Sequence, residues 1–178
     1  MQERFNRSVI VLYDFIRDPF KNSIEDVEDD KSLVFIASLL SGFTVIARYL
    51  CSPMNDWVSV AFLLGGLLLT PLFGLLIVHF KGAIFSLYLG FFASKFINEN
   101  LFNLLKSKQI MTFSTIGLIV SSVPSLTNVG ILIGLLIEIL GIYRLFQIDL
   151  KKSILIAIIY HALWWGLIYL IAKGTAWI

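Results

Sequence analysis

Trp57–Ile97 reads WVSVAFLLGGLLLTPLFGLLIVHFKGAIFSLYLGFFASKFI, and the fold depends on how this stretch divides into helices. Its apolar length exceeds the roughly 20 residues that one helix needs to cross a bilayer. One division places a short segment, Trp57–Leu69, before a single tilted span from Thr70 to about Ile97. The other division turns the chain at His79–Gly82 and gives two spans. The first leads to five membrane spans in the chain and the second to six.

The basic residues favour the first division because cytoplasmic loops of membrane proteins are enriched in Lys and Arg. Further apolar stretches lie at 32–50, 111–125, 129–146 and 154–172. With five spans, eleven of the 14 basic residues lie on the cytoplasmic side. With six, Lys95 and the cluster around Arg144 move outside. The sequence therefore predicts an all-α integral membrane bundle of five transmembrane helices, with a cytoplasmic N-terminus and an outer C-terminus.

Local signals set the expected ends of these spans. Proline suits the first turn of a helix, so Thr70-Pro71 predicts that Thr70 is the N-cap of the second span. The alternative is one long helix from Trp57, kinked at Gly65-Gly66 and at the proline. The polar stretch 98–109 is expected at the cytoplasmic surface. The short outer connection at 125–129 predicts that the third and fourth spans form an antiparallel hairpin.

The first part of the chain is expected outside the membrane. Residues 1–31 form a cytoplasmic amphipathic helix and an acidic linker in this interpretation, and residues 32–178 form the membrane domain. Apolar residues at intervals of three and four align on one helix face. Such a face can lie in the headgroup region or bind a partner. Its members are Phe5, Val9, Leu12, Ile16 and Phe20.

Glycines offer close contact surfaces in the later spans. Gly130 and Gly134 form a small-xxx-small pair, and Gly141 continues the series with Gly117 on the preceding span. Such pairs let two helices approach closely in a membrane. Packing within the chain and dimerisation both remain open from the sequence.

Composition excludes several classes of protein. Hydrophobic residues make up 58% of the chain and charged ones 15%, against about 25% charged in soluble domains. The net charge of +2 and the spread of the basic residues argue against nucleic-acid binding. The single cysteine, Cys51, excludes an intrachain disulfide. No nucleophile elbow, zinc motif or phosphate-binding loop is present, so we expect no enzyme, no catalytic residue, no metal and no cofactor.

Four ionisable residues are expected at middle depth in the membrane: His79, Lys81, Glu138 and His161. An ion in hydrocarbon costs about 3 kcal/mol or more, so such groups face the bundle and pair. We expect a Lys81–Glu138 pair near the histidines. Such a cluster has two interpretations, a proton- or ion-responsive site and a structural polar contact.

Three stretches resemble the Yip (Ypt-interacting protein) superfamily, particularly its prokaryotic members. They are VLYDFIRDPF from Val11 to Phe20 with the acidic residues after it, TPLFGLL from Thr70 together with the later proline Pro124, and LIEILGIYRLFQIDLKKSI from Leu136 to Ile154. One departure is that Lys106-Ser-Lys-Gln109 replaces the glycine pair expected before the third span. The resemblance implies five spans and a cytoplasmic N-terminus. Eukaryotic members of the family are implicated in membrane traffic, binding of Rab-type GTPases and membrane shaping.

Two functions fit these observations. The first is a non-catalytic membrane scaffold or accessory subunit, which binds a protein partner or a second copy through the amphipathic helix, the acidic linker and the glycine faces. The second is a small transporter or permease-type component that uses the region of Lys81, Glu138 and His161 as a polar path. The absence of a visible inverted repeat argues against a self-sufficient secondary carrier. The expected location is the bacterial cytoplasmic membrane.

Overall fold

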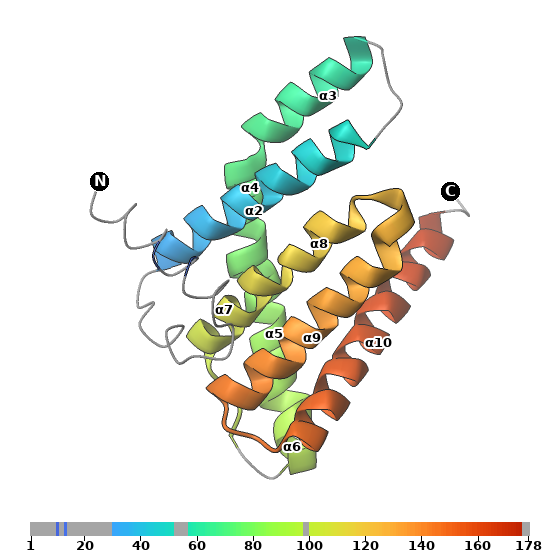
Figure 1. The fold of residues 1–178 in the computed structure, drawn as a ribbon. Coiled ribbons are helices and arrows are strands. Elements are labelled where there is room, and N and C mark those ends of the chain that lie inside the picture. The colour runs from blue at the N-terminus through green and yellow to red at the C-terminus, as the bar shows by residue number, and fades with distance from the viewer. Residues whose placement is uncertain (1–9, 11–12, 14–29, 52–56, 98–99, 176–178) are drawn as a thin grey trace.

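A computed structural model describes residues 10, 13, 30–51, 57–97 and 100–175. Every regular element in these ranges is a helix, and the helices pack as a bundle (Figure 1). Three stretches are long and apolar enough to cross a membrane: Lys31–Leu50, Thr70–Ala93 and Pro124–Leu145. The predicted all-α membrane architecture is confirmed to this extent. Five spans and their orientation remain predictions.

The first two helices form an antiparallel pair. Helix α2 spans Asp30–Leu50, and helix α3, Trp57–Leu68, runs back beside it (Figure 1). Arg48 near the end of α2 is exposed, as expected for a side chain that reaches the membrane surface. Helix α3 lies at the edge of the bundle, and its Phe62 and Leu68 are 79% and 80% exposed.

The stretch Trp57–Ile97, on which the number of spans depends, is helical throughout apart from a turn at Leu69. After α3 come α4 (Thr70–Leu75), η2 (Leu76–Lys81), α5 (Gly82–Tyr88), η3 (Leu89–Ala93) and α6 (Ser94–Ile97). No turn occurs at His79–Gly82, and Thr70–Ala93 is one stretch long and apolar enough to cross a membrane. The prediction that Thr70 is the N-cap is wrong. Leu69 holds that position, and the Thr70 hydroxyl instead donates to the Leu67 carbonyl at 2.9 Å.

Two parts of this helix are π-helical, η2 and η3. A π turn contains one residue more than an α turn and is frequent at functional sites. The first segment carries His79 and Lys81, and the second lies beside the C-terminal helix. Phe85 between the two segments and Leu89 at the start of the second are fully buried in the core.

The second half of the chain completes the core. Helices α7 (Leu104–Ser114) and α8 (Ile116–Ser121) are separated by a turn at Thr115. The short helix η4 (Pro124–Leu126) leads into α9 (Thr127–Leu145), which packs antiparallel to α8 as predicted. Helix α10 (Leu150–Thr175) packs on α9. Met111, Phe113 and Ile142 are almost fully buried among these helices.

The prediction that 98–109 is a surface connection is wrong for its second half. Helix α7 begins at Leu104, and Ser107, Lys108 and Gln109 on it are buried. Their polarity is tolerated because polar groups find partners: the Ser107 hydroxyl donates to the Asn103 carbonyl at 2.8 Å. The Lys106 ammonium donates to the carbonyl of Leu145, the last residue of α9, where the helix dipole favours a cation.

The N-cap of α7 gives a first testable prediction. The Asn103 side chain accepts a hydrogen bond from the Lys106 backbone N–H at 3.0 Å. Because an Asn-to-Ala change at an N-cap costs about 1 kcal/mol, we expect N103A to lower the free energy of unfolding in detergent by that amount. The exposed Asn128 on α9 serves as control, and N128A should cause a smaller loss. Equal losses in the two variants would contradict the capping role.

Candidate functional site

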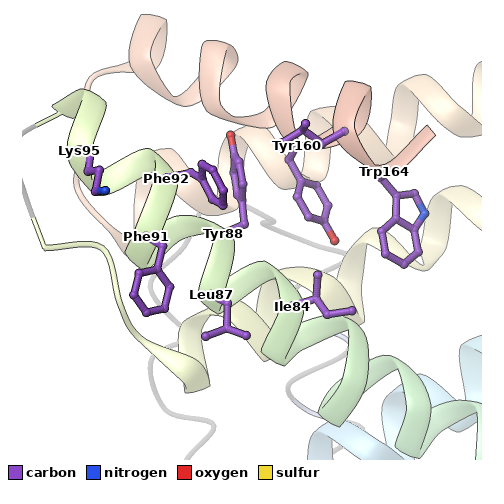
Figure 2. A pocket seen from close by; sticks show the side chains of 9 residues that line it. Ile84, Leu87, Tyr88, Phe91, Phe92, Lys95, Tyr160 and Trp164 are labelled. Atoms are coloured by element: carbon purple, nitrogen blue, oxygen red, sulfur yellow. The ribbon is translucent and has the colours of Figure 1, made fainter. Parts of the chain in front are cut away.

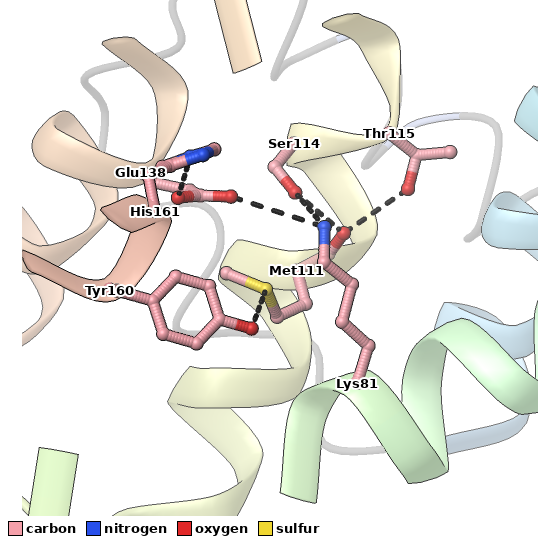
Figure 3. Close-up of polar contacts among 7 residues, drawn as sticks. All are labelled: Lys81, Met111, Ser114, Thr115, Glu138, Tyr160 and His161. Carbon is pink, nitrogen blue, oxygen red and sulfur yellow. Dashed lines mark hydrogen bonds and ion pairs between the residues drawn. The ribbon is translucent and has the colours of Figure 1, made fainter. Parts of the chain in front are cut away.

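The candidate site is centred on Glu138, in the middle of α9. Its side chain is 1% exposed, and its two carboxylate oxygens face different partners. Oε2 lies 2.7 Å from Nε2 of His161 on α10, and Oε1 lies 4.0 Å from the Lys81 ammonium (Figure 3). The contact with His161 departs from ideal hydrogen-bond geometry although its length is that of an ion pair. One buried carboxylate thus joins the second, fourth and fifth predicted spans.

A second set of contacts positions the lysine. Its Nζ donates to the Ser114 hydroxyl at 3.4 Å, and that hydroxyl donates to the Met111 carbonyl at 3.0 Å (Figure 3). The same carbonyl accepts from the Thr115 hydroxyl at 3.1 Å. The Met111 carbonyl therefore accepts two side-chain hydrogen bonds at the turn between α7 and α8. This break places Ser114 against the lysine.

A cavity of about 110 Å³ adjoins these groups. Lys81, Glu138 and His161 line one part of it, and Ser121 and Gly130 line another part beside the α8–α9 turn. The eight residues from Gly130 to Glu138 correspond to about 12 Å along the helix axis. The cavity thus extends from middle depth toward the end of the bundle where α8 and α9 meet. It is called the polar cavity below because Lys81, Glu138 and His161 line it, although glycines and apolar side chains such as Leu118 and Ile131 form much of its wall. It has room for several water molecules.

Glycines bring α8 and α9 close enough to form this wall. A Cβ atom added at Gly117 would lie 2.5 Å from the Gly130 carbonyl oxygen and 2.7 Å from the Gly134 nitrogen. A Cβ at Gly141 would lie 2.6 Å from Cγ1 of Ile110. The glycines therefore serve packing within the chain. These contacts support packing within the chain, one of the two alternatives that the sequence left open.

The predicted site residues separate into three groups. Lys81, Glu138 and His161 come together, whereas His79 does not join them. His79 is exposed and lies two residues before Lys81, so its side chain leaves the helix on another face. The five members of the predicted partner face, Phe5, Val9, Leu12, Ile16 and Phe20, lie outside the described residues. Within the described ranges, no group of three His, Cys, Asp or Glu side chains is placed to hold a metal ion.

Sequence reasoning missed Ser114, Tyr160 and Trp164, which also line the cavity. Tyr160 is 4% exposed, and its hydroxyl contacts the Met111 sulfur at 3.9 Å. Its position one residue before His161, on a helix expected to face Glu138, was the only available signal. Ser114 carried no signal because hydroxyl residues are common in apolar helices, where they bond to their own backbone.

Comparison with models of known protein families, with curated proteins and with solved structures finds no match for this chain. The resemblance to the Yip superfamily therefore stays a prediction.

Proposed function

We propose that this chain is a non-catalytic membrane transport component in which Glu138 and His161 take up and release a proton. The observation that carries the proposal is the buried Glu138 carboxylate, which lies 2.7 Å from His161 and 4.0 Å from Lys81 where the three line one cavity. Ionisable residues that face the interior of a membrane bundle mark many known ion pathways and proton relays. The cavity lining extends from this cluster to Ser121 and Gly130 near the α8–α9 turn.

The chemistry of the three groups supports proton exchange. A carboxylate and an imidazole can each bind and release a proton, and these two lie 2.7 Å apart between Oε2 and Nε2. The Lys81 ammonium lies 4.0 Å from the other carboxylate oxygen of Glu138. Water in the cavity would connect the pair to the bundle end. A path to the opposite membrane face would require movement of the packed residues below Glu138 or the contribution of another subunit.

Proton flux through reconstituted protein tests the proposal. The full chain is placed in liposomes with a trapped pH-sensitive dye, and a potassium diffusion potential drives protons inward. We expect the wild type to acidify the lumen faster than protein-free liposomes, and E138Q to abolish that difference. The exposed Arg48 supplies a matched control, and R48Q should keep the wild-type rate. Equal rates in wild type and E138Q would overturn the proposed function.

The accessory-subunit hypothesis is the second candidate, and one observation favours it. Helix α3 lies at the edge of the bundle and exposes Phe62 and Leu68. Among the described residues this apolar helix packs mainly against α2 and the following α4, which leaves a face for another membrane protein. Purification in mild detergent from the native membrane, followed by mass spectrometry, tests this. A stoichiometric partner that is lost in F62S/L68S would support an accessory subunit, and recovery of the chain alone would oppose it.

A further inference from the structure

A second, larger cavity lies on the other side of Tyr160. It is an open groove of about 810 Å³ between the α5–η3–α6 part of the second span and α10. Aromatic and aliphatic side chains form its walls, and Lys95 lies at one end with Trp164 at the other (Figure 2). The polar cavity shares Tyr160 and Trp164 with this groove and none of its other lining residues.

The floor of the groove is apolar although two tyrosines form it. The Tyr88 hydroxyl donates to the Ile156 carbonyl at 2.8 Å, and the Tyr160 hydroxyl contacts the Met111 sulfur. Both hydroxyls are thereby turned to protein partners. The two rings lie 5.3 Å apart between their centroids, so mainly ring carbon atoms face the groove. Such a surface fits a hydrocarbon chain better than a polar solute.

The length of the groove matches one leaflet of a bilayer. Ile84 and Lys95, which both line it, are eleven residues apart, or about 16 Å along a helix axis. This is about half of the 30 Å hydrocarbon core. The apolar span ends at Ala93, so Lys95 lies just beyond it. Its exposed ammonium is placed at headgroup level while the groove descends toward the bilayer centre.

From the apolar floor, the length and the single cation at the mouth, we propose that the groove binds one anionic phospholipid. An acyl chain occupies the groove along Leu87, Phe91 and Tyr88, and the phosphate contacts Lys95. The η3 segment widens the helix beside the groove and exposes Phe91 and Phe92, which are 62% and 59% exposed, as walls for the chain. A lysine near an anionic membrane surface contributes about 1 kcal/mol to binding.

Native mass spectrometry of the full chain tests this site. Protein is equilibrated with equal amounts of phosphatidylglycerol and phosphatidylcholine that carry identical acyl chains. We expect wild type to retain one phosphatidylglycerol with a preference of about fivefold, and K95Q to lose the preference. L87W, which fills the groove at a half-exposed position, should reduce retention of both lipids.

Lys173 supplies the control because it is an exposed lysine near the other end of α10. K173Q should retain the wild-type preference. Equal retention of both lipids by wild type would mean annular lipid only and would overturn the proposal, as would a preference that survives in K95Q. Lys95 and Leu87 do not line the polar cavity. Failure of this proposal therefore leaves the proton-flux result untouched.

Discussion

E138Q is expected to lower the free energy of unfolding by about 3 kcal/mol. Removing one partner of a buried ion pair leaves the other charge uncompensated, which costs about 3–5 kcal/mol when both groups are fully buried. Lys81 and His161 are 25% and 24% exposed, which places the expected loss at the lower end. Unfolding of the detergent-solubilised chain by increasing sodium dodecyl sulfate, followed by tryptophan fluorescence, measures the change.

The pairing itself is tested by a double-mutant cycle. K81M alone should also destabilise the chain, because the Glu138 carboxylate then keeps only His161 as a partner. The double variant E138Q/K81M should lose less than the sum of the two single variants, since it leaves neither charge behind. Additive losses would show that the 4.0 Å contact contributes nothing to stability. R48Q, at an exposed position, controls for the general effect of removing a charge.

G117A is expected to cost about 3 kcal/mol, the upper part of the range for overpacked cores. The added Cβ would meet backbone atoms of Gly130 and Gly134, which cannot move without separating α8 from α9. Gly166 on α10 is the matched control, because a Cβ there would meet nothing within 4 Å. We expect G166A to be neutral or slightly stabilising, since Ala is the better helix former.

Thermal unfolding monitored by size-exclusion chromatography in detergent distinguishes the two roles of these glycines. G117A should aggregate or unfold at a lower temperature than wild type and G166A. If Gly117 and Gly130 instead formed a dimer face, G117A would shift the elution from dimer to monomer and leave the unfolding temperature unchanged. That outcome would contradict the intrachain contact.

The sequence was sufficient to predict the helices that are marked by a long run of apolar residues. The stretches predicted at 32–50, from Thr70, and at 129–146 coincide with the three stretches that can cross a membrane. Basic residues were informative because they alone opposed a turn at His79–Gly82. The Thr70 cap was mispredicted because the helix does not begin there: the Leu69 N–H donates to the Gly65 carbonyl and carries the hydrogen bonding across the bend.

The candidate site was predicted only in part, for a physical reason. The free-energy cost of an ion in the hydrocarbon core indicates that Lys81, Glu138 and His161 need partners. Which partners they contact depends on how each helix is rotated about its own axis, and the sequence does not give that rotation. The start of α7 shows the same limit. Lys106 and Gln109 looked like residues of a surface loop, yet Lys106 donates to the end of α9 and Gln109 is 1% exposed. Polarity alone does not distinguish a solvated loop from a helix whose polar groups are satisfied inside the bundle.

The π-helical segments also determine which faces of the helical stretch Thr70–Ile97 contact its three neighbours, α2, α7 and α10, in turn. Gly74 packs against Val34 and Ser38 of α2, Gly82 packs against Lys108 of α7, and Phe85 packs edge-on against Tyr160 of α10 with ring centroids 4.7 Å apart. Each additional residue in a π turn rotates the later part of the helix by about 100° relative to the earlier part. Deleting a single residue within Leu76–Lys81 would restore a plain α-helix and rotate the two halves out of phase. The number of residues in this segment is therefore constrained more tightly than their identity, because a substitution changes one contact and a deletion misdirects a whole helix face.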